Sequence, residues 1–122
     1  MGVRTTRQRR GTQAEDDAVA YLEQAGWQLI GRNVRLGRDE IDILATDPGP
    51  PPALVFVEVR GATSAAFGLP EERVDRAKVG HLYRAARLLP YERQLPRRVD
   101  LVIVDRRTGR AVFRHLRALE PP

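Results

Sequence analysis

The stretch that decides the fold is residues 40–60, with the sequence EIDILATDPGPPPALVFVEVR. It contains two strand-like segments, Glu40–Asp47 and Ala53–Arg60, which are dense in β-branched residues. The segment between them, PGPPP, cannot continue a strand and therefore predicts a turn. A hairpin that is symmetric about Pro50 sets Leu44 opposite Phe56, and a slip of two residues is the alternative register.

The predicted register sets Asp42 opposite Glu58 and Glu40 opposite Arg60. Carboxylates opposed across a hairpin lie about 4.5–5.5 Å apart at Cβ and repel each other unless a cation compensates. Oxygen ligands without Cys or His nearby suit Mg²⁺ or Mn²⁺. Solvated strand ends with a Glu40–Arg60 ion pair produce the same spacing, so the spacing alone also fits a purely structural role. The other face of the hairpin is expected to be apolar: Ile41, Ile43, Val55, Val57 and Val59.

A helix and a strand are expected before the hairpin. Thr12 and Glu15 fit a capping box, so we expect the helix to begin at Thr12. Gly26 is a suitable C-terminal stop, and residues 27–34 predict a strand. The apolar stripe of the expected helix consists of Ala14, Ala18, Tyr21, Leu22 and Ala25.

A second helix and two further strands are expected after the hairpin. The helix follows a loop that contains residues 67–70, runs over residues 71–89 and ends before Pro90. Strands are predicted at residues 99–105 and 110–116. A helix that links strands of one sheet makes a parallel crossover, so the expected fold is α/β with a mixed sheet. The predicted inner stripe of the second helix is Val74, Ala77, His81, Ala85 and Leu88.

Length and composition indicate one domain. The chain has 122 residues, of which 42% are hydrophobic, and we place a flexible basic arm at residues 1–11 and the domain at residues 12–119. No apolar run is long enough to cross a membrane, and the N-terminus lacks the apolar stretch of a secretory signal. There is no cysteine, which excludes disulfides and thiolate metal sites. A cytoplasmic protein is therefore expected.

The charge is basic and is carried almost entirely by arginine. The net charge is +5, and Lys78 is the single lysine among 21 basic residues. A basic surface is typical of nucleic-acid binders, because phosphate contacts release counterions. An arginine-rich genomic composition explains the charge equally well. Aromatic residues make up only 6% of the chain, which argues against a base-stacking platform.

Five short motifs occur in order along roughly residues 10–105. They are EDDA at 15–18, GRDEID at 37–42, FVEVR at 56–60, FGLP at 67–70 and RVD at 98–100. Together they resemble the YraN family of small bacterial proteins, which is grouped with the restriction-endonuclease-like fold and with Holliday-junction resolvases. The resemblance implies that fold, binding of branched or otherwise structured DNA and, as in related resolvases, a homodimer.

The resemblance also implies a metal-dependent endonuclease site of the type acid, spacer, Glu-x-Lys. Asp42 and Glu58 would bind Mg²⁺ or Mn²⁺ together with the carbonyl of Val59, and Asp42 and Glu58 would be catalytic. Glu15 matches the helix glutamate that can complete such a site, and its capping box is an equal alternative. Glu40 is either a further acid or only the partner of Arg60, and Asp100 is a weaker candidate for such an acid, with a strand cap as the alternative.

Position 60 departs from the resemblance. Arg60 stands where the pattern has lysine, and arginine keeps the charge but cannot accept a proton. Lys78 on the second helix is an auxiliary candidate for the missing lysine, although an exposed helix charge is the simpler interpretation. The leading hypothesis is an endonuclease in which Arg60 assists, and the activity stays open because of this substitution. The alternatives are an inactive nucleic-acid-binding module and a protein-interaction adaptor.

Overall fold

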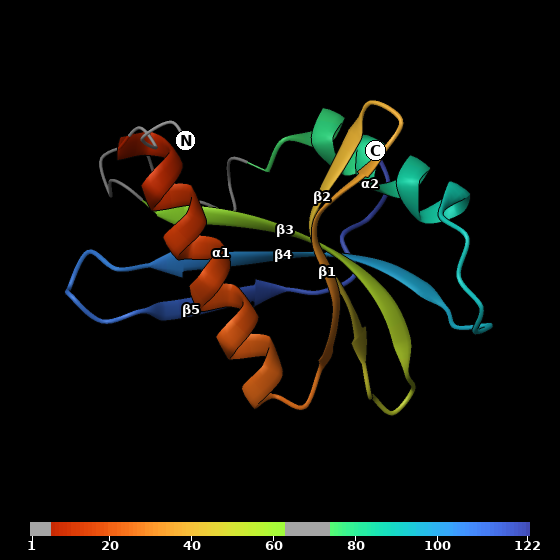
Figure 1. Cartoon of the computed structure of the whole chain (residues 1–122), viewed down its shortest axis with the longest axis horizontal. Coiled ribbons are helices and arrows are strands. Elements are labelled where there is room, and N and C mark those ends of the chain that lie inside the picture. Colours follow the sequence, from red (N-terminus) through yellow and green to blue (C-terminus); the bar gives the residue numbers. More distant parts are fainter. Residues whose placement is uncertain (1–5, 63–73) are drawn as a thin grey trace, which may run out of the picture.

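A five-stranded mixed sheet lies between two helices in the computed structural model, which describes residues 6–62 and 74–122 (Figure 1). Neither helix is long and apolar enough to cross a membrane. The predicted loop at residues 67–70 lies outside the described residues. In chain order the elements are α1 (Thr6–Gln24), β1 (Gln28–Leu36), β2 (Asp39–Asp47), β3 (Ala53–Ala62), α2 (Arg76–Leu88), β4 (Arg97–Asp105) and β5 (Val112–Leu116).

The strands are ordered as they occur in the chain, from β1 to β5. The β3–β4 pair is parallel because α2 carries the chain back across the sheet between them, and the other pairs are antiparallel. The mixed α/β architecture and the predicted element order are therefore confirmed. Strands β1 and β5 are the sheet edges.

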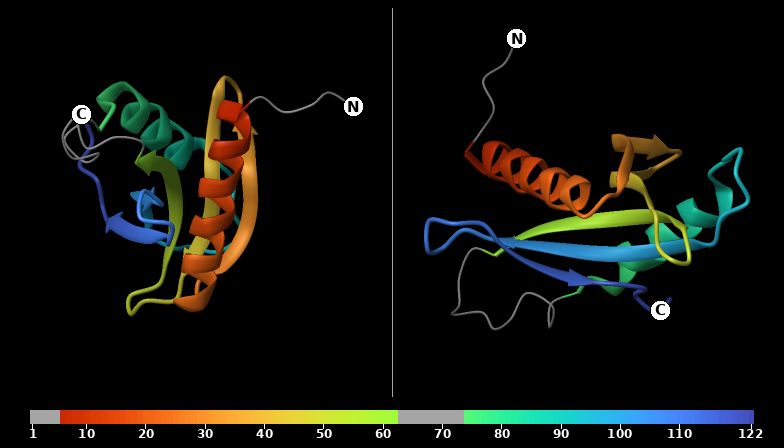
Figure 2. Two further views of the ribbon diagram at one scale, coloured as in Figure 1. Left: turned by 90° about the vertical axis from the view of Figure 1, so that its left-hand side faces the viewer. Right: turned by 90° about the horizontal axis from the view of Figure 1, so that it is seen from below.

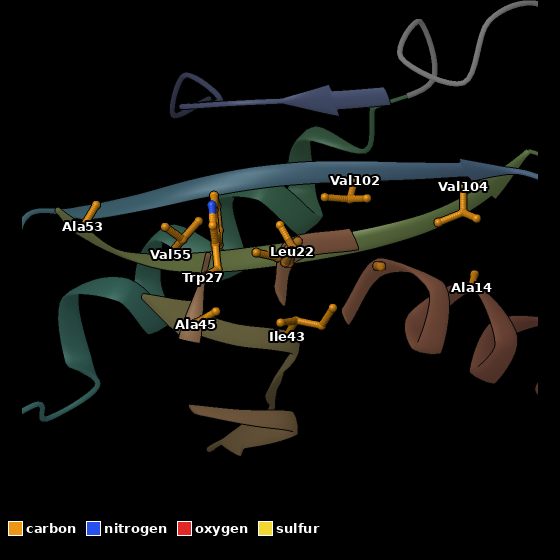
Figure 3. Packing of buried hydrophobic residues seen from close by; sticks show 11 residues of the cluster. Ala14, Leu22, Trp27, Ile43, Ala45, Ala53, Val55, Val102 and Val104 are labelled. Atoms are coloured by element: carbon orange, nitrogen blue, oxygen red, sulfur yellow. The ribbon is translucent and has the colours of Figure 1, made fainter. Parts of the chain in front are cut away.

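The helices cover opposite faces of the sheet (Figure 2). Ala18, Leu22 and Trp27 pack with Val55 and Val102 on the α1 side. Figure 3 shows the side chains of Leu22, Trp27, Val55 and Val102 in this cluster. Leu82 and Ala85 of α2 pack with Leu54, Phe56 and Val99 on the other side. The central strands β3 and β4 are thus buried on both faces, as is usual for parallel neighbours with helical cover.

The predicted register of the central hairpin is confirmed. Leu44 pairs with Phe56, and the ladder runs from Asp47–Ala53 to Ile43–Val57. The predicted apolar face is wrong at Ile41, which packs in the α2 cluster instead of beside Ile43. The reason is that the N-terminal part of β2, before Ile43, no longer pairs with β3 but still pairs with β1. This divergence carries Ile41 to the α2 side of the sheet.

Helix α1 begins earlier than the sequence predicts. It starts at Thr6, so Thr12 is an interior residue and the capping-box start is wrong. Residues 6–11 of the expected arm are helical, and residues 1–5 lie outside the described part. Ala14, Ala18 and Leu22 are buried as predicted, whereas Ala25 is exposed. Gly26 ends the helix with a φ of 89°, and the Trp27 N–H donates to the Leu22 carbonyl at 3.0 Å.

Helix α2 begins at Arg76, with Asp75 as its N-cap, instead of at residue 71. Residues 71–73 of the prediction lie outside the described residues. The predicted stripe is largely wrong, because Ala77, His81 and Leu88 are exposed. Alanines occur on several sides of this helix and define its inner face poorly from sequence. The buried residues are Val79, Leu82, Ala85 and Ala86.

Asp100 is a buried structural carboxylate and not merely a strand cap. Arg98 donates two hydrogen bonds to it, at 2.8 and 2.9 Å, and the Ala118 N–H donates a third at 3.0 Å. His115 Nε2 lies 2.8 Å from its Oδ2. Burial by itself raises the pKa of Asp100, but hydrogen bonds from His115, Arg98 and Ala118 outweigh burial and hold the pKa below its usual value.

We expect Asp100→Asn to lower the free energy of unfolding by about 3 kcal/mol at pH 7, because it leaves the half-buried Arg98 guanidinium without its negatively charged partner. The folded-state pKa of Asp100 is depressed, so its contribution is present above about pH 4 and lost at lower pH. Urea unfolding at several pH values measures both effects. Asp105→Asn, at a half-exposed carboxylate paired with Arg107, should change the midpoint far less, and equal effects of the two variants would contradict the assignment.

Candidate functional site

Asp42 marks the place where β2 and β3 separate. The last ladder pair is Ile43–Val57, one step short of the predicted opposition of Asp42 and Glu58. Beyond it, Oδ2 of Asp42 accepts the Val59 N–H at 2.9 Å, so a side-chain carboxylate stands in for a strand carbonyl. Strand β3 continues alongside β4 as far as Ala62, while β2 continues alongside β1. Asp42, Glu58 and Val59 thus lie together at the point where β2 and β3 diverge.

Glu58 is the most perturbed carboxylate at this point. Its side chain is only 13% exposed, and its Oε2 is buried without a hydrogen-bond donor. Burial and the charge of Asp42 raise the pKa of Glu58 from its ordinary 4.5 to about 8, against the opposing effect of Lys78 and Arg60. A buried carboxyl group with an unsatisfied oxygen is an arrangement that a bound cation would relieve.

Two cationic side chains flank Glu58 from different elements. Nε of Arg60, on the same strand, lies 3.6 Å from Oε1, and Nζ of Lys78, on α2, lies 3.8 Å from Oε2. The interpretation of Lys78 as an ordinary exposed helix charge is therefore wrong. The predicted cross-strand pair of Glu40 with Arg60 is also wrong, because Arg60 turns to Glu58 and Glu40 lies 3.9 Å from Arg35.

A second acidic group adjoins Asp42. Glu15 of α1 has a raised pKa, caused first by burial and then by the negative charge of Asp42. When the Asn33 amide is oriented so that both of its ends are satisfied, its nitrogen donates to Oε1 of Glu15 at 3.0 Å and to Oε1 of Glu40 at 3.1 Å. Sequence reasoning missed Asn33. Its signal was an asparagine within a predicted strand, and the residue has a φ of 50°, a conformation that asparagine tolerates well.

Sequence reasoning also missed the ion pair that fixes the β1–β2 hairpin to α2. Arg84 donates to both carboxylate oxygens of Asp39, at 3.0 and 2.7 Å, and Asp39 is buried. A bidentate guanidinium–carboxylate pair constrains both distance and orientation. The Arg84–Asp39 pair joins α2, which carries Lys78, to β2, which carries Asp42. It therefore helps to fix the position of Lys78 relative to Asp42.

The donor set fits a hard divalent cation. Asp42 and Glu58 supply carboxylate oxygens, and the unsatisfied Oε2 of Glu58 is an unused ligand atom. Mg²⁺ and Mn²⁺ need only one or two carboxylates when water and substrate phosphate complete the shell. Over residues 6–62 and 74–122, no three acidic or histidine side chains converge closely enough to form a complete cage. Asp42 and Glu58 are therefore the pair that could hold such an ion, with Glu15 further out.

These features define a class: a small α/β domain with a carboxylate pair where two central strands diverge. The model of the uncharacterised protein family UPF0102 matches residues 14–104, and the chain belongs to that family. This membership confirms the resemblance noted from the five motifs.

Relatives named UPF0102 protein occur in distant bacteria. One from Arthrobacter sp. is 38% identical over 113 residues, which are 89% of this chain and 93% of the relative. One from Bacteroides thetaiotaomicron is 36% identical over 115 residues, covering 92% of this chain and 93% of the relative. One from Halorhodospira halophila is 44% identical over 89 residues, covering 70% of this chain and 71% of the relative.

The pKa of Glu58 predicts a pH dependence of stability. The folded state binds the Glu58 proton more tightly than the unfolded state, so the metal-free protein should lose stability as pH rises from about 4.5 to about 8. The loss should be on the order of 5 kcal/mol, because each pH unit between 4.5 and about 8 contributes roughly 1.4 kcal/mol. Glu58→Gln should remove most of this fall because it cannot ionise. Urea unfolding in EDTA across this range measures the effect, and the exposed Glu92→Gln is the control. Parallel profiles for wild type and Glu58→Gln would refute the burial argument.

Proposed function

We propose that this protein is a divalent-metal-dependent endonuclease that hydrolyses phosphodiester bonds in branched or damaged DNA. The observation that carries the proposal is the proximity of Asp42 to Glu58, whose side chain is only 13% exposed and whose Oε2 is buried without a hydrogen-bond donor. Placing two carboxylates together costs stability in the metal-free protein, and the flanking Lys78 and Arg60 compensate that cost only in part. A role in binding a cation accounts for it.

The residues would divide the work as follows. Asp42 and Glu58 would hold Mg²⁺ or Mn²⁺, with the carbonyl of Val59 as a further ligand, and Glu15 would lie outside the ligand shell as an additional negative charge. When bound, such an ion polarises a phosphodiester and lowers the pKa of an attacking water. Arg60, whose side chain is 41% exposed, would neutralise charge that develops on the phosphate. Glu40 would contribute only through its hydrogen bond from Asn33, and Lys78 would be the second positively charged side chain beside Glu58.

Charge and composition support a nucleic-acid partner in the cytoplasm. The net charge of +5 favours association with phosphates. The chain has no cysteine and so lacks the disulfides that are typical of small secreted domains. A four-way junction presents two symmetric strands, so a homodimer would suit that substrate. The edge strand β5, with Val112 54% exposed, would be available for such pairing.

A second candidate is a catalytically inactive nucleic-acid-binding module of the same fold. The observation that favours it is Arg60, which stands where the resemblance calls for lysine. A guanidinium stays protonated and is broader than an ammonium group, so it can bind phosphate without supporting every step of hydrolysis. Binding without cleavage, weakening steeply with rising salt, would identify this function.

Cleavage of labelled DNA tests the proposal. Wild type with Mg²⁺ or Mn²⁺ should cut at least one of linear, nicked, flapped and four-way-junction DNA, and EDTA should stop the reaction. Asp42→Ala and Glu58→Ala should each lower the rate at least about 100-fold, because each removes a ligand. The exposed Glu92→Ala should cut like wild type. Arg60→Lys should cut at least as fast as wild type, since it restores the lysine of the pattern.

The outcomes separate the candidates. Cutting that persists in Asp42→Ala and Glu58→Ala would mean a contaminating nuclease or another site. Salt-sensitive binding without cutting by wild type, with cutting restored in Arg60→Lys, would identify a disabled nuclease. Neither cutting nor salt-sensitive binding by any variant would reject the nucleic-acid function and leave the adaptor.

A further inference from the structure

We infer that Lys78 is an exchangeable counter-ion of the acidic site, which holds Oε2 of Glu58 in the metal-free protein and is displaced when a divalent cation binds. The inference rests on the proposed metal site of Asp42 and Glu58. It concerns how the negative charge of that site is compensated in the absence of metal, and it assigns a function to helix α2 that the sequence of the helix does not predict.

The first support is the position of the ammonium group. Nζ of Lys78 lies 3.8 Å from the one oxygen of Glu58 that is buried and lacks a hydrogen-bond donor. That separation gives charge compensation without a hydrogen bond. A cation bound to the same oxygen would sit about 2 Å from it, so the ammonium and the ion would repel each other at close range.

The second support is that Lys78 is anchored at its backbone and free to move at its tip. The Asp75 carboxylate accepts the N–H groups of Ala77 and Lys78, at 3.0 and 3.2 Å, and Val79 and Leu82 are buried beneath the helix. The Lys78 side chain is 32% exposed, so its ammonium has a route to solvent. Four rotatable methylene groups allow that movement without a shift of α2.

The third support is the kind of residue. Twenty of the 21 basic residues of the chain are arginine, and the single lysine is the one that contacts Glu58 across the α2–β3 interface. A guanidinium would offer Glu58 a planar fork and a strong bidentate pair, which a metal ion displaces less readily. A compact ammonium compensates the negative charge that Asp42 and Glu58 share without forming a hydrogen bond, so it can be exchanged.

Binding of Mn²⁺ to the full-length protein tests the inference without any need for DNA cleavage. Titration with Mn²⁺, followed by the electron paramagnetic resonance signal of the free ion, gives the dissociation constant. Lys78→Met should bind Mn²⁺ about tenfold more tightly than wild type, because the competing charge is gone. Lys78→Gln repeats the loss of charge with a polar side chain and should show the same shift.

Two controls keep the charge or move its loss elsewhere. Lys78→Arg retains a cation beside Glu58 and should bind Mn²⁺ no more tightly than wild type. Arg87→Met removes one positive charge from the same helix nine residues further on, roughly 13 Å away along its axis, and should match wild type. Thermal unfolding of each metal-free variant verifies that it is folded before titration.

The outcomes judge the inference separately from the nuclease. Unchanged or weaker Mn²⁺ binding by both neutral Lys78 variants would overturn the inference, even if wild type cuts DNA. Tighter binding by both, with no DNA cut by wild type, would uphold the inference and reject the nuclease. No Mn²⁺ binding by any folded variant would overturn the inference and the proposed metal site together.

Discussion

The hydrogen bond from the Val59 N–H to the Asp42 carboxylate, at 2.9 Å, is the contact on which the arrangement of the site depends. A strand amide normally donates to a backbone carbonyl of the neighbouring strand. Here a side chain takes that place, so β2 ends its ladder with β3 at Ile43. The β1–β2 hairpin can then leave the sheet plane. Without this exchange Asp42 would stand in regular register and the strands would leave no opening beside Glu58.

Two carboxylates of the same sheet show how surroundings separate structure from chemistry. Asp100 is fully buried, and every contact described for it donates or carries positive charge, so its pKa lies below the usual range. The Glu58 side chain is 13% exposed, but its Oε2 is buried and lacks a hydrogen-bond donor, and its pKa is raised to about 8. A buried carboxylate that only stabilises the fold is expected to have its hydrogen bonds satisfied. The oxygen of Glu58 that lacks a hydrogen-bond donor, together with the raised pKa, distinguishes it as the candidate functional carboxylate.

Helix α2 links the two halves of the site. Arg84 holds Asp39 at the start of β2, and Lys78 faces Glu58 on β3. Buried Leu82, between them in sequence, and buried Ala85, which follows Arg84, fix the helix against the sheet. The spacing between Asp42 and Glu58 is therefore set by packing on α2 as well as by the sheet. On the other face α1 contributes Glu15, which Asn33 bridges to Glu40, so the acidic group is enclosed from both sides.

The sequence by itself determined the local elements and indicated the pairing of the central hairpin. A hairpin symmetric about Pro50 predicted Leu44 opposite Phe56 and Asp42 near Glu58, and the structure chose this register over a slip of two residues, which the sequence had left open. Tertiary structure alone decided which cation meets which acid. Arg60 turns to Glu58 and not to Glu40, and Lys78 reaches Glu58 from a helix 20 residues later in the chain. Tertiary structure also decided the divergence of β2 from β3, which takes Ile41 to the α2 side of the sheet. Strand periodicity is a property of neighbours in sequence, whereas contacts of long charged side chains depend on how distant elements pack.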